Sequence, residues 1–180
     1  MVYLISIFVF LMILAPVLAI LPSAKQRDQL KKRKLAMARG VRVQLTHIDD
    51  PDQDPAKYLS NTGKPLARKL PIVAYRLARP RPEMWREGVV NEWALHRDLR
   101  GSESTFFDFG VRGWHCVDRP PNGFEESWKN FFQLKLPRLP ADVVRVEEKK
   151  YMLTIFWNEE GEVDEILEFL STCAQLTIVD

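Results

Sequence analysis

The sequence contains few of the residues from which common active sites are assembled. Its 180 residues include two cysteines, three histidines and eight glycines. The glycines form neither the G-x-G-x-x-G pattern of dinucleotide-binding proteins nor the G-x-x-x-x-G-K-[S/T] pattern of phosphate-binding loops. The cysteines and histidines show none of the paired spacings that zinc sites use. We therefore predict no catalytic residues, no cofactor and no metal site, and we expect a non-enzymatic protein without a small-molecule substrate.

Charged residues are also absent from residues 1–22, and they become dense directly afterwards. Twenty helical residues span roughly 30 Å, which matches the hydrocarbon core of a bilayer. Basic residues remain on the cytoplasmic side of such a segment. The chain is therefore predicted to be a single-pass membrane protein, with its N-terminus outside and its C-terminal domain in the cytoplasm. Its expected partners are the lipid bilayer and a membrane protein.

A cleaved secretory signal and a buried helix of a soluble protein are the two alternative interpretations of this apolar run. Such a signal carries its positive charge before a shorter run and ends at small residues. Ala15 and Ala19 could supply the small residues, but the basic segment that follows opposes translocation. In a cytoplasmic domain Cys116 and Cys173 are expected to be free thiols, with a single disulfide as the alternative.

The sequence predicts three parts: a transmembrane anchor at 1–22, a basic juxtamembrane helix at 23–40 and a cytoplasmic domain at 41–180. Alternating apolar residues predict strands near 41–46, 70–78, 89–97 and 114–117, and further strands at 106–109, 143–146 and 151–157. The last two could instead form one long bent strand. Apolar residues at helical spacing predict helices from Phe124 to Pro137 and from Val163 to Ala174. The predicted fold class is α+β, in which the transmembrane helix precedes a small, mainly antiparallel sheet with at least two packed helices.

The basic helix is the first candidate site. Residues 43–180 carry 18 basic and 23 acidic side chains, so the domain itself lacks the basic footprint of a nucleic-acid partner. The helix could bind anionic lipid headgroups, or it could serve only to set topology and act as a solvated spacer. Its candidate lipid-contacting residues are Lys25, Arg27, Lys31, Lys32, Arg33, Lys34 and Arg39.

A tryptophan in a polar loop is the second candidate. Trp85 lies among charged residues directly after two prolines, close to Arg81 and Arg86. Exposed Trp and Arg side chains are common at the centres of protein interfaces. We therefore predict that Trp85, Arg81 and Arg86 dock a partner or contact a membrane.

A membrane-tethered thiol enzyme is one alternative to an interaction domain, and an anionic-lipid-binding regulatory domain is the other. His115 and Cys116 are adjacent, and Asp118 is near them. Neighbouring residues on a strand point to opposite faces, so Cys116 would need His47 or His96 to be brought close by the fold. A concave site containing these groups would favour a membrane-tethered enzyme.

The first 45 residues resemble a known family in their layout. The chain has an apolar run, then Ala24-Lys25-Gln26-Arg27-Asp28-Gln29-Leu30-Lys31-Lys32-Arg33, then the turn Gly40-Val41-Arg42-Val43 into a strand. This layout resembles the YajC-type accessory subunit of the bacterial preprotein translocase. Leu21-Pro22-Ser23-Ala24-Lys25 replaces the family's Arg-Pro-Gln-Gln-Lys-like motif, and its glycine-rich hairpin is missing. The resemblance implies an accessory or assembly factor of a membrane complex. Together with the short N-out anchor, it implies the bacterial inner (plasma) membrane as the location.

Overall fold

The computed structural model describes Tyr3, Phe10 and Met12 and residues 22–50, 58–80, 92–97, 111–120 and 123–176. The chain divides into two units, Met1–Lys34 and Leu35–Asp180. Its helices and strands in chain order are α2 (Ala24–Ala38), β1 (Arg42–Asp49), β2 (Lys69–Ala78), β3 (Trp93–Arg97), β4 (Trp114–Asp118), α3 (Glu126–Lys135), the short 3₁₀ helix η3 (Leu136–Arg138), β5 (Val143–Lys149), β6 (Met152–Trp157) and α4 (Val163–Gln175). The strand expected at 106–109 lies outside the described residues.

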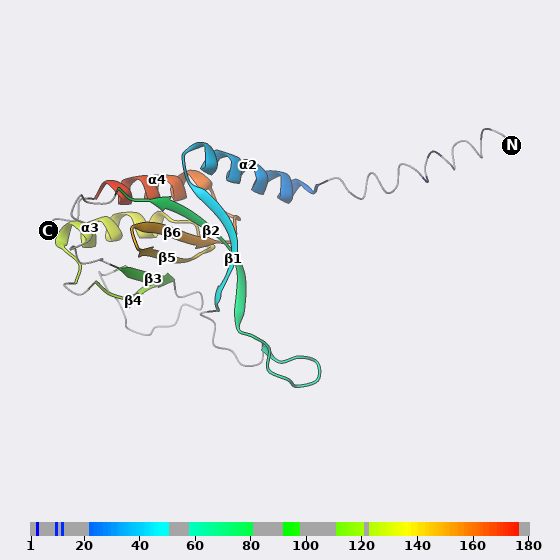
Figure 1. Cartoon of the computed structure of the whole chain (residues 1–180), viewed down its shortest axis with the longest axis horizontal. Helices are drawn as coiled ribbons and strands as arrows, with labels where there is room; N and C mark the ends of the chain where they lie inside the picture. The colour runs from blue at the N-terminus through cyan, green and yellow to red at the C-terminus, as the bar shows by residue number, and fades with distance from the viewer. Residues whose placement is uncertain are drawn as a thin grey trace. The chain divides into compact units, whose positions relative to one another are not determined.

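The second unit is built on one sheet. Its described strands have the order β1-β2-β6-β5-β3-β4, and every neighbouring pair is antiparallel. Figure 1 shows α3 and α4 on the same side of this sheet. β1 and β4 are its two edge strands. Five strand spacings of about 4.8 Å therefore separate them by roughly 24 Å.

Local sequence signals fix both ends of α2. At its start, the Ser23 Oγ accepts a hydrogen bond from the Gln26 amide at 3.2 Å, and the Gln26 Oε1 accepts one from the Ser23 amide at 2.9 Å. This reciprocal pair is a capping box. At its end, Gly40 has a φ of 79°, and the Gly40 and Val41 amides donate to the Met37 and Ala36 carbonyls. These two bonds form a Schellman motif, which turns the chain from α2 directly into β1.

The main core lies between the sheet and the helices. Trp93 is 1% exposed, and its ring lies 5.7 Å from the ring of Trp128 and 5.2 Å from that of Phe132 on α3. Phe131 on α3 contacts Phe169 on α4 at a ring distance of 5.0 Å. The apolar stripe of α4 is buried, as its spacing predicts, at Val163, Ile166, Leu167, Leu170 and Cys173. Aromatic packing thus holds both helices on one face.

The other face of the sheet has a smaller apolar cluster. It consists of Ile72, Ala74, Val144 and Phe156, each at most 7% exposed. These residues alternate along β2, β5 and β6 with residues of the main core, as the two-residue period of a strand requires. A turn of Lys150 and Tyr151, both with positive φ, joins β5 to β6. The two predicted strands at 143–146 and 151–157 are therefore the arms of one hairpin.

The predicted transmembrane helix is a wrong prediction. No helix of residues 22–50, 58–80, 92–97, 111–120 or 123–176 is long and apolar enough to cross a membrane. α2, α3 and α4 have 15, 10 and 13 residues, whereas a span needs about 20, and α2 is largely polar. The fold class is corrected to an antiparallel six-stranded sheet with three helices among the described residues. The predicted single-pass topology and inner-membrane localisation are wrong for the same reason. Apart from Tyr3, Phe10 and Met12, residues 1–21 lie outside the described part.

Candidate interaction surface

The structure does not bring the candidate thiol and histidines together. In the pairing of β3 with β4, Cys116 lies opposite Leu95, whereas His115 lies opposite His96. Cys116 therefore faces the main core, and its Sγ donates to the Asp118 carbonyl at 3.1 Å. His96 and His115 share the other face, with ring centroids 5.8 Å apart. His47 is on β1, at the opposite edge of the sheet. The dispersal argues against a thiol active site built from these groups.

The lowered pKa of His96 in the His96–His115 pair does not suit a general base. Burial, the Arg145 charge and His115 lower the pKa of His96 from 6.5 to about 4, so its imidazole is neutral at pH 7. Its Nε2 is buried and has no hydrogen-bond partner among the described residues. A base with so low a pKa is a weak proton acceptor. Within the described part of the chain, no three His, Cys, Asp or Glu residues gather in a way that could hold a metal ion.

The predicted lipid-contacting residues are all on or next to α2. Lys32 pairs with Asp28 at 2.8 Å, and most of the helix is exposed. Its only buried residue is Ala36, in the last turn, which belongs to the second unit. Arg39 differs from the other basic residues because it pairs with Asp164 at the start of α4 at 3.1 Å. The Arg39–Asp164 ion pair thus links two helices within the second unit. The remaining candidate residues for lipid contact lie in the Ala24–Lys34 part of α2.

The predicted docking site falls outside the part of the chain that the structure describes. Trp85, Arg81 and Arg86 lie outside the described residues. Arg79, which precedes this loop in the sequence, is 6% exposed and bonded within the core. The described range that ends at residue 80 is therefore held by a buried ion pair one residue before its end.

The outer edge of β1 carries Leu45, the most exposed large hydrophobic residue that the structure describes in the second unit. β1 pairs with β2 in unbroken register from Arg42 to Asp49, and no described strand lies on its other side. Leu45, at the middle of the strand, is 68% exposed, and Met37, in the last turn of α2, is 56% exposed. We call Met37, Val43 and Leu45, together with the outer backbone of β1, the β1 edge.

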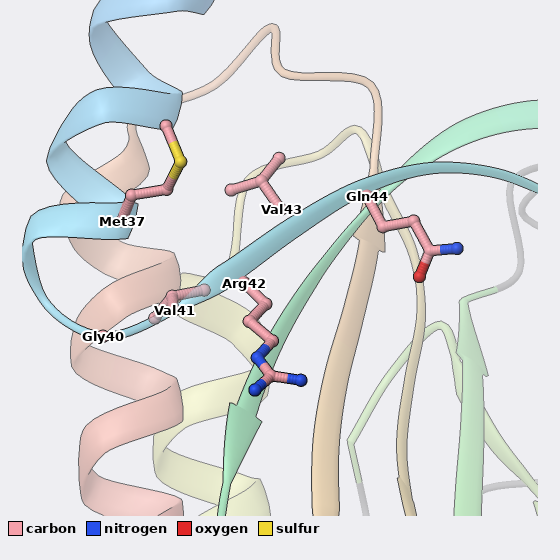
Figure 2. Close-up of a pocket in the computed structure, with 6 residues that line it drawn as sticks. All are labelled: Met37, Gly40, Val41, Arg42, Val43 and Gln44. Atoms are coloured by element: carbon pink, nitrogen blue, oxygen red, sulfur yellow. The ribbon is translucent and has the colours of Figure 1, made fainter.

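A shallow groove runs along the first half of this edge. It has a volume of about 560 Å³ and is lined by Met37, Gly40, Val41, Arg42, Val43 and Gln44. Figure 2 shows the Met37 and Val43 side chains on one side of the strand and the Arg42 and Gln44 side chains on the other. The groove is therefore apolar on the side of the helices and polar on the opposite side. Its form follows from the Gly40 turn, which sets the end of α2 beside the start of β1.

Sequence reasoning located this strand but missed the site. The alternation of residues 41–46 predicts a half-buried strand, yet it does not reveal which strands flank it. The edge position of β1 comes from the pairing of β2 with β6, more than 70 residues further along the chain. No signal in the sequence marks the edge, because Leu45 fits the alternation and only the structure shows that it is 68% exposed.

Comparison of the chain with protein-family models, with curated proteins and with solved structures finds no match. The resemblance of residues 1–45 to the translocase accessory subunit therefore stays a prediction from the sequence.

Proposed function

We propose that this protein is a non-enzymatic interaction domain, an accessory factor that binds a protein partner along the β1 edge. The exposed, unbroken β1 edge is the observation that carries the proposal. A free strand edge presents a row of backbone donors and acceptors to an added strand. Partners that add a strand gain affinity from backbone hydrogen bonds and specificity from pockets for alternate side chains. The groove beside Met37 and Val43 has the position of such a pocket.

The distribution of the other groups supports binding rather than catalysis. The four described tryptophans, Trp93, Trp114, Trp128 and Trp157, are at most 7% exposed and belong to the core. Cys173 is fully buried, and the Cys116 thiol donates a hydrogen bond to a backbone carbonyl. Leu45 and Met37, by contrast, expose apolar surface that the described part of the fold leaves uncovered. An exposed apolar strand edge is a characteristic of interaction sites.

A paired set of surface variants tests the proposal. Leu45→Lys puts a charge on the β1 edge, and Leu134→Lys makes the same change on α3, where Leu134 is 58% exposed. Tagged full-length chains are purified under mild conditions, and the recovered proteins are quantified by mass spectrometry. We expect a stoichiometric partner that Leu134→Lys retains and Leu45→Lys loses at least tenfold. Equal recovery with both variants would refute the β1 edge as the binding surface.

Anionic lipid headgroups are a second candidate partner, and the Ala24–Lys34 part of α2 supports them. This segment has six basic residues and one acidic residue, and its exposed apolar residue Leu30 stands alone. Each basic residue near an anionic surface contributes about 1 kcal/mol of attraction, which salt screens. Such binding is electrostatic, because the segment presents no apolar face to insert.

Vesicle sedimentation separates this candidate from the first. Full-length protein is mixed with phosphatidylcholine vesicles with or without phosphatidylserine. The test protein is the triple variant Arg27→Gln, Lys31→Gln, Lys34→Gln. The control is a second triple variant, Lys64→Gln, Arg68→Gln, Lys69→Gln, which removes the same charge elsewhere. The candidate requires that phosphatidylserine and low salt increase binding and that only the first variant removes this increase. Binding that is insensitive to phosphatidylserine excludes headgroup recognition by α2.

A further inference from the structure

Two arginines lie side by side on the face of the sheet that is opposite α3 and α4. Arg42 on β1 is the in-register partner of Arg76 on β2. Their neighbours Val43 and Tyr75 pack in the main core, so the two arginines project from the other face. Directly opposed residues have Cβ atoms about 4.5–5.5 Å apart, and like charges in such positions destabilise a sheet. The pair therefore requires a counter-charge.

The described strands place no carboxylate next to this pair. Its neighbours on the same face of β1, β2 and β6 are Gln44, Ala74, Ala78 and Thr154. The first carboxylate further along the row is Glu147 on β5, two strand spacings or about 10 Å from Arg76. Glu147 is already paired with Arg145 at 2.5 Å and with Lys149 at 3.8 Å. The counter-charge is thus missing from the described sheet.

Arg76 differs in this respect from the comparable arginines. The other arginines that the structure describes as at least partly buried in the second unit each have a carboxylate or carbonyl acceptor, and they are Arg79, Arg97 and Arg145. Arg76 has no such acceptor among the described residues, and its Nε is buried without a hydrogen-bond partner. A buried donor without an acceptor is unfavourable, because it has lost its water and gained no bond. The arginine pair therefore has both an unbalanced charge and an unused donor.

We propose that Arg42 and Arg76 bind the phosphate group of a phosphomonoester. The guanidinium fork matches the oxygens of a phosphate and can bond them bidentately. A phosphomonoester carries a charge of about −1.5 to −2 at pH 7, which balances two guanidinium groups, whereas a carboxylate balances only one. The Gln44 amide and the Thr154 hydroxyl flank the pair on neighbouring positions of the same face. They add uncharged hydrogen-bonding groups to the site.

The phosphate site is separate from the β1 edge. Figure 2 shows the Arg42 and Gln44 side chains on one side of β1 and the Met37 and Val43 side chains on the other. Leu45, two residues after Val43, shares the side of Val43, because side chains alternate along a strand. The phosphate site is also made of residues other than the Ala24–Lys34 part of α2. The inference therefore does not depend on the proposed function.

Titration calorimetry with glycerol 3-phosphate tests the site in the full-length protein. Arg76→Gln removes one guanidinium, Arg76→Lys keeps the charge without the fork, and Arg138→Gln removes an exposed charge from η3. We expect Arg76→Gln to weaken binding at least tenfold, Arg76→Lys to weaken it less, and Arg138→Gln to leave it unchanged. Inorganic phosphate should compete with glycerol 3-phosphate, and acetate should not. Equal competition by acetate would overturn the assignment of a phosphate group.

Thermal unfolding separates ligand binding from a structural role of Arg76. Without ligand, Arg76→Gln should melt no lower than wild type, because it removes the repulsion from Arg42. Glycerol 3-phosphate should raise the melting temperature of wild type and leave that of Arg76→Gln unchanged. An equal rise in both proteins would overturn the site, even if the variant is less stable.

Vesicle sedimentation identifies the source of the phosphate group. Phosphatidylcholine vesicles that contain phosphatidic acid, whose headgroup is a phosphomonoester, are compared with vesicles of equal charge that contain phosphatidylserine. Every protein in this comparison carries Arg27→Gln, Lys31→Gln and Lys34→Gln, which removes the contribution of α2. A preference for phosphatidic acid that Arg76→Gln abolishes identifies a lipid headgroup, and Arg76-dependent binding of glycerol 3-phosphate alone identifies a free ester. If neither ligand requires Arg76, the proposal is overturned.

Discussion

Arg79 and Glu148 form a buried ion pair that joins the sheet to the end of α4. The Arg79 Nε lies 3.2 Å from the Glu148 Oε1, and the two side chains are 4% and 3% exposed. The other Arg79 nitrogens donate to the Leu176 carbonyl at 3.0 Å and the Cys173 carbonyl at 2.7 Å. The Trp93 Nε1 donates to the Glu148 Oε2 at 3.0 Å. A cation is favourable at a helix C-terminus, so this one guanidinium neutralises both the carboxylate and the end of α4.

Removing the Glu148 charge is expected to destabilise the fold strongly. Burial raises the pKa of Glu148, and the Arg79 charge opposes that rise. The ionised form of the carboxylate is therefore stabilised by Arg79. Glu148→Gln leaves the buried Arg79 without this counter-charge and should lower the free energy of unfolding by about 3 kcal/mol. Urea unfolding measures this value. Glu126→Gln, which breaks the exposed 3.2 Å pair with Lys129, is the control and should cost about 0.5 kcal/mol or less. Similar losses for both variants would contradict the structural role of Arg79.

Acidification is expected to destabilise the protein through His96. Its pKa is lowered from 6.5 to about 4 by burial and by Arg145, while Asp118 opposes this and His115 and Lys149 add to it. Between these two values the unfolded chain binds a proton that the folded chain does not, so stability falls as the pH drops from 6.5 to 4. One pKa unit corresponds to about 1.4 kcal/mol, and partial exposure of the ring reduces the total to about 2 kcal/mol.

Comparing wild type with His96→Gln isolates this contribution. Urea unfolding at pH 7 and at pH 4.5 should show a smaller loss of stability in the variant. Glu148 titrates in both proteins, so its effect cancels in the difference. An identical loss in the two proteins would mean that His96 is not protected from protonation by the fold.

Gly161 is expected to tolerate no side chain. A Cβ at this position would lie 2.3 Å from the Cβ of Pro140 and 2.8 Å from its Cγ, which is inside van der Waals contact with a rigid ring. Gly161→Ala should therefore cost about 1–3 kcal/mol, as overpacking does elsewhere. Its neighbour Glu162 is exposed and makes no side-chain cap, so Glu162→Ala should stay within about 0.5 kcal/mol. Thermal unfolding of both variants measures the contrast, and equal melting temperatures would disprove the close contact.

The two cysteines are expected to differ in reactivity. Both are free, as predicted from the sequence; Cys116 is partly exposed, whereas Cys173 is fully buried and its pKa is raised by burial. A thiolate-selective reagent should therefore modify one thiol per folded chain and two in denaturant. Cys116→Ser should abolish the reaction of the folded chain. Two reactive thiols in the folded wild type would show that the core beneath α4 is open.

The local elements were predictable because their signals lie within a few residues. The S-x-x-Q start of α2, the glycine that ends it and the apolar stripe of α4 each act over one or two helical turns. The strand alternation at 70–78 likewise coincides with β2. The transmembrane prediction failed because it relied on one long apolar run, and the described helices supply neither the length nor the even apolarity of a span.

The arrangement of the elements was not predictable from the same signals. The order of strands, which makes β1 an edge, depends on pairing between segments that are far apart in the sequence. Arg79 appears in the sequence as the start of a polar loop, and only the fold reveals its contacts with Glu148 and the end of α4. His115 and Cys116 illustrate the opposite case, because the alternation of a strand correctly predicts that they face apart.

Hydrogen–deuterium exchange at β1 tests the central claim of the account most directly. If the β1 edge accepts a strand, the outward amides of Arg42–Asp49 become hydrogen-bonded in the associated protein and exposed on dilution. The account predicts that exchange in this peptide slows at least tenfold at high protein concentration, that Leu45→Lys removes the slowing, and that the Trp114–Asp118 peptide of the other edge strand, β4, is unaffected. The measurement uses wild type purified together with every protein bound to it. If exchange at β1 does not depend on protein concentration, the claim that the β1 edge accepts a strand is contradicted.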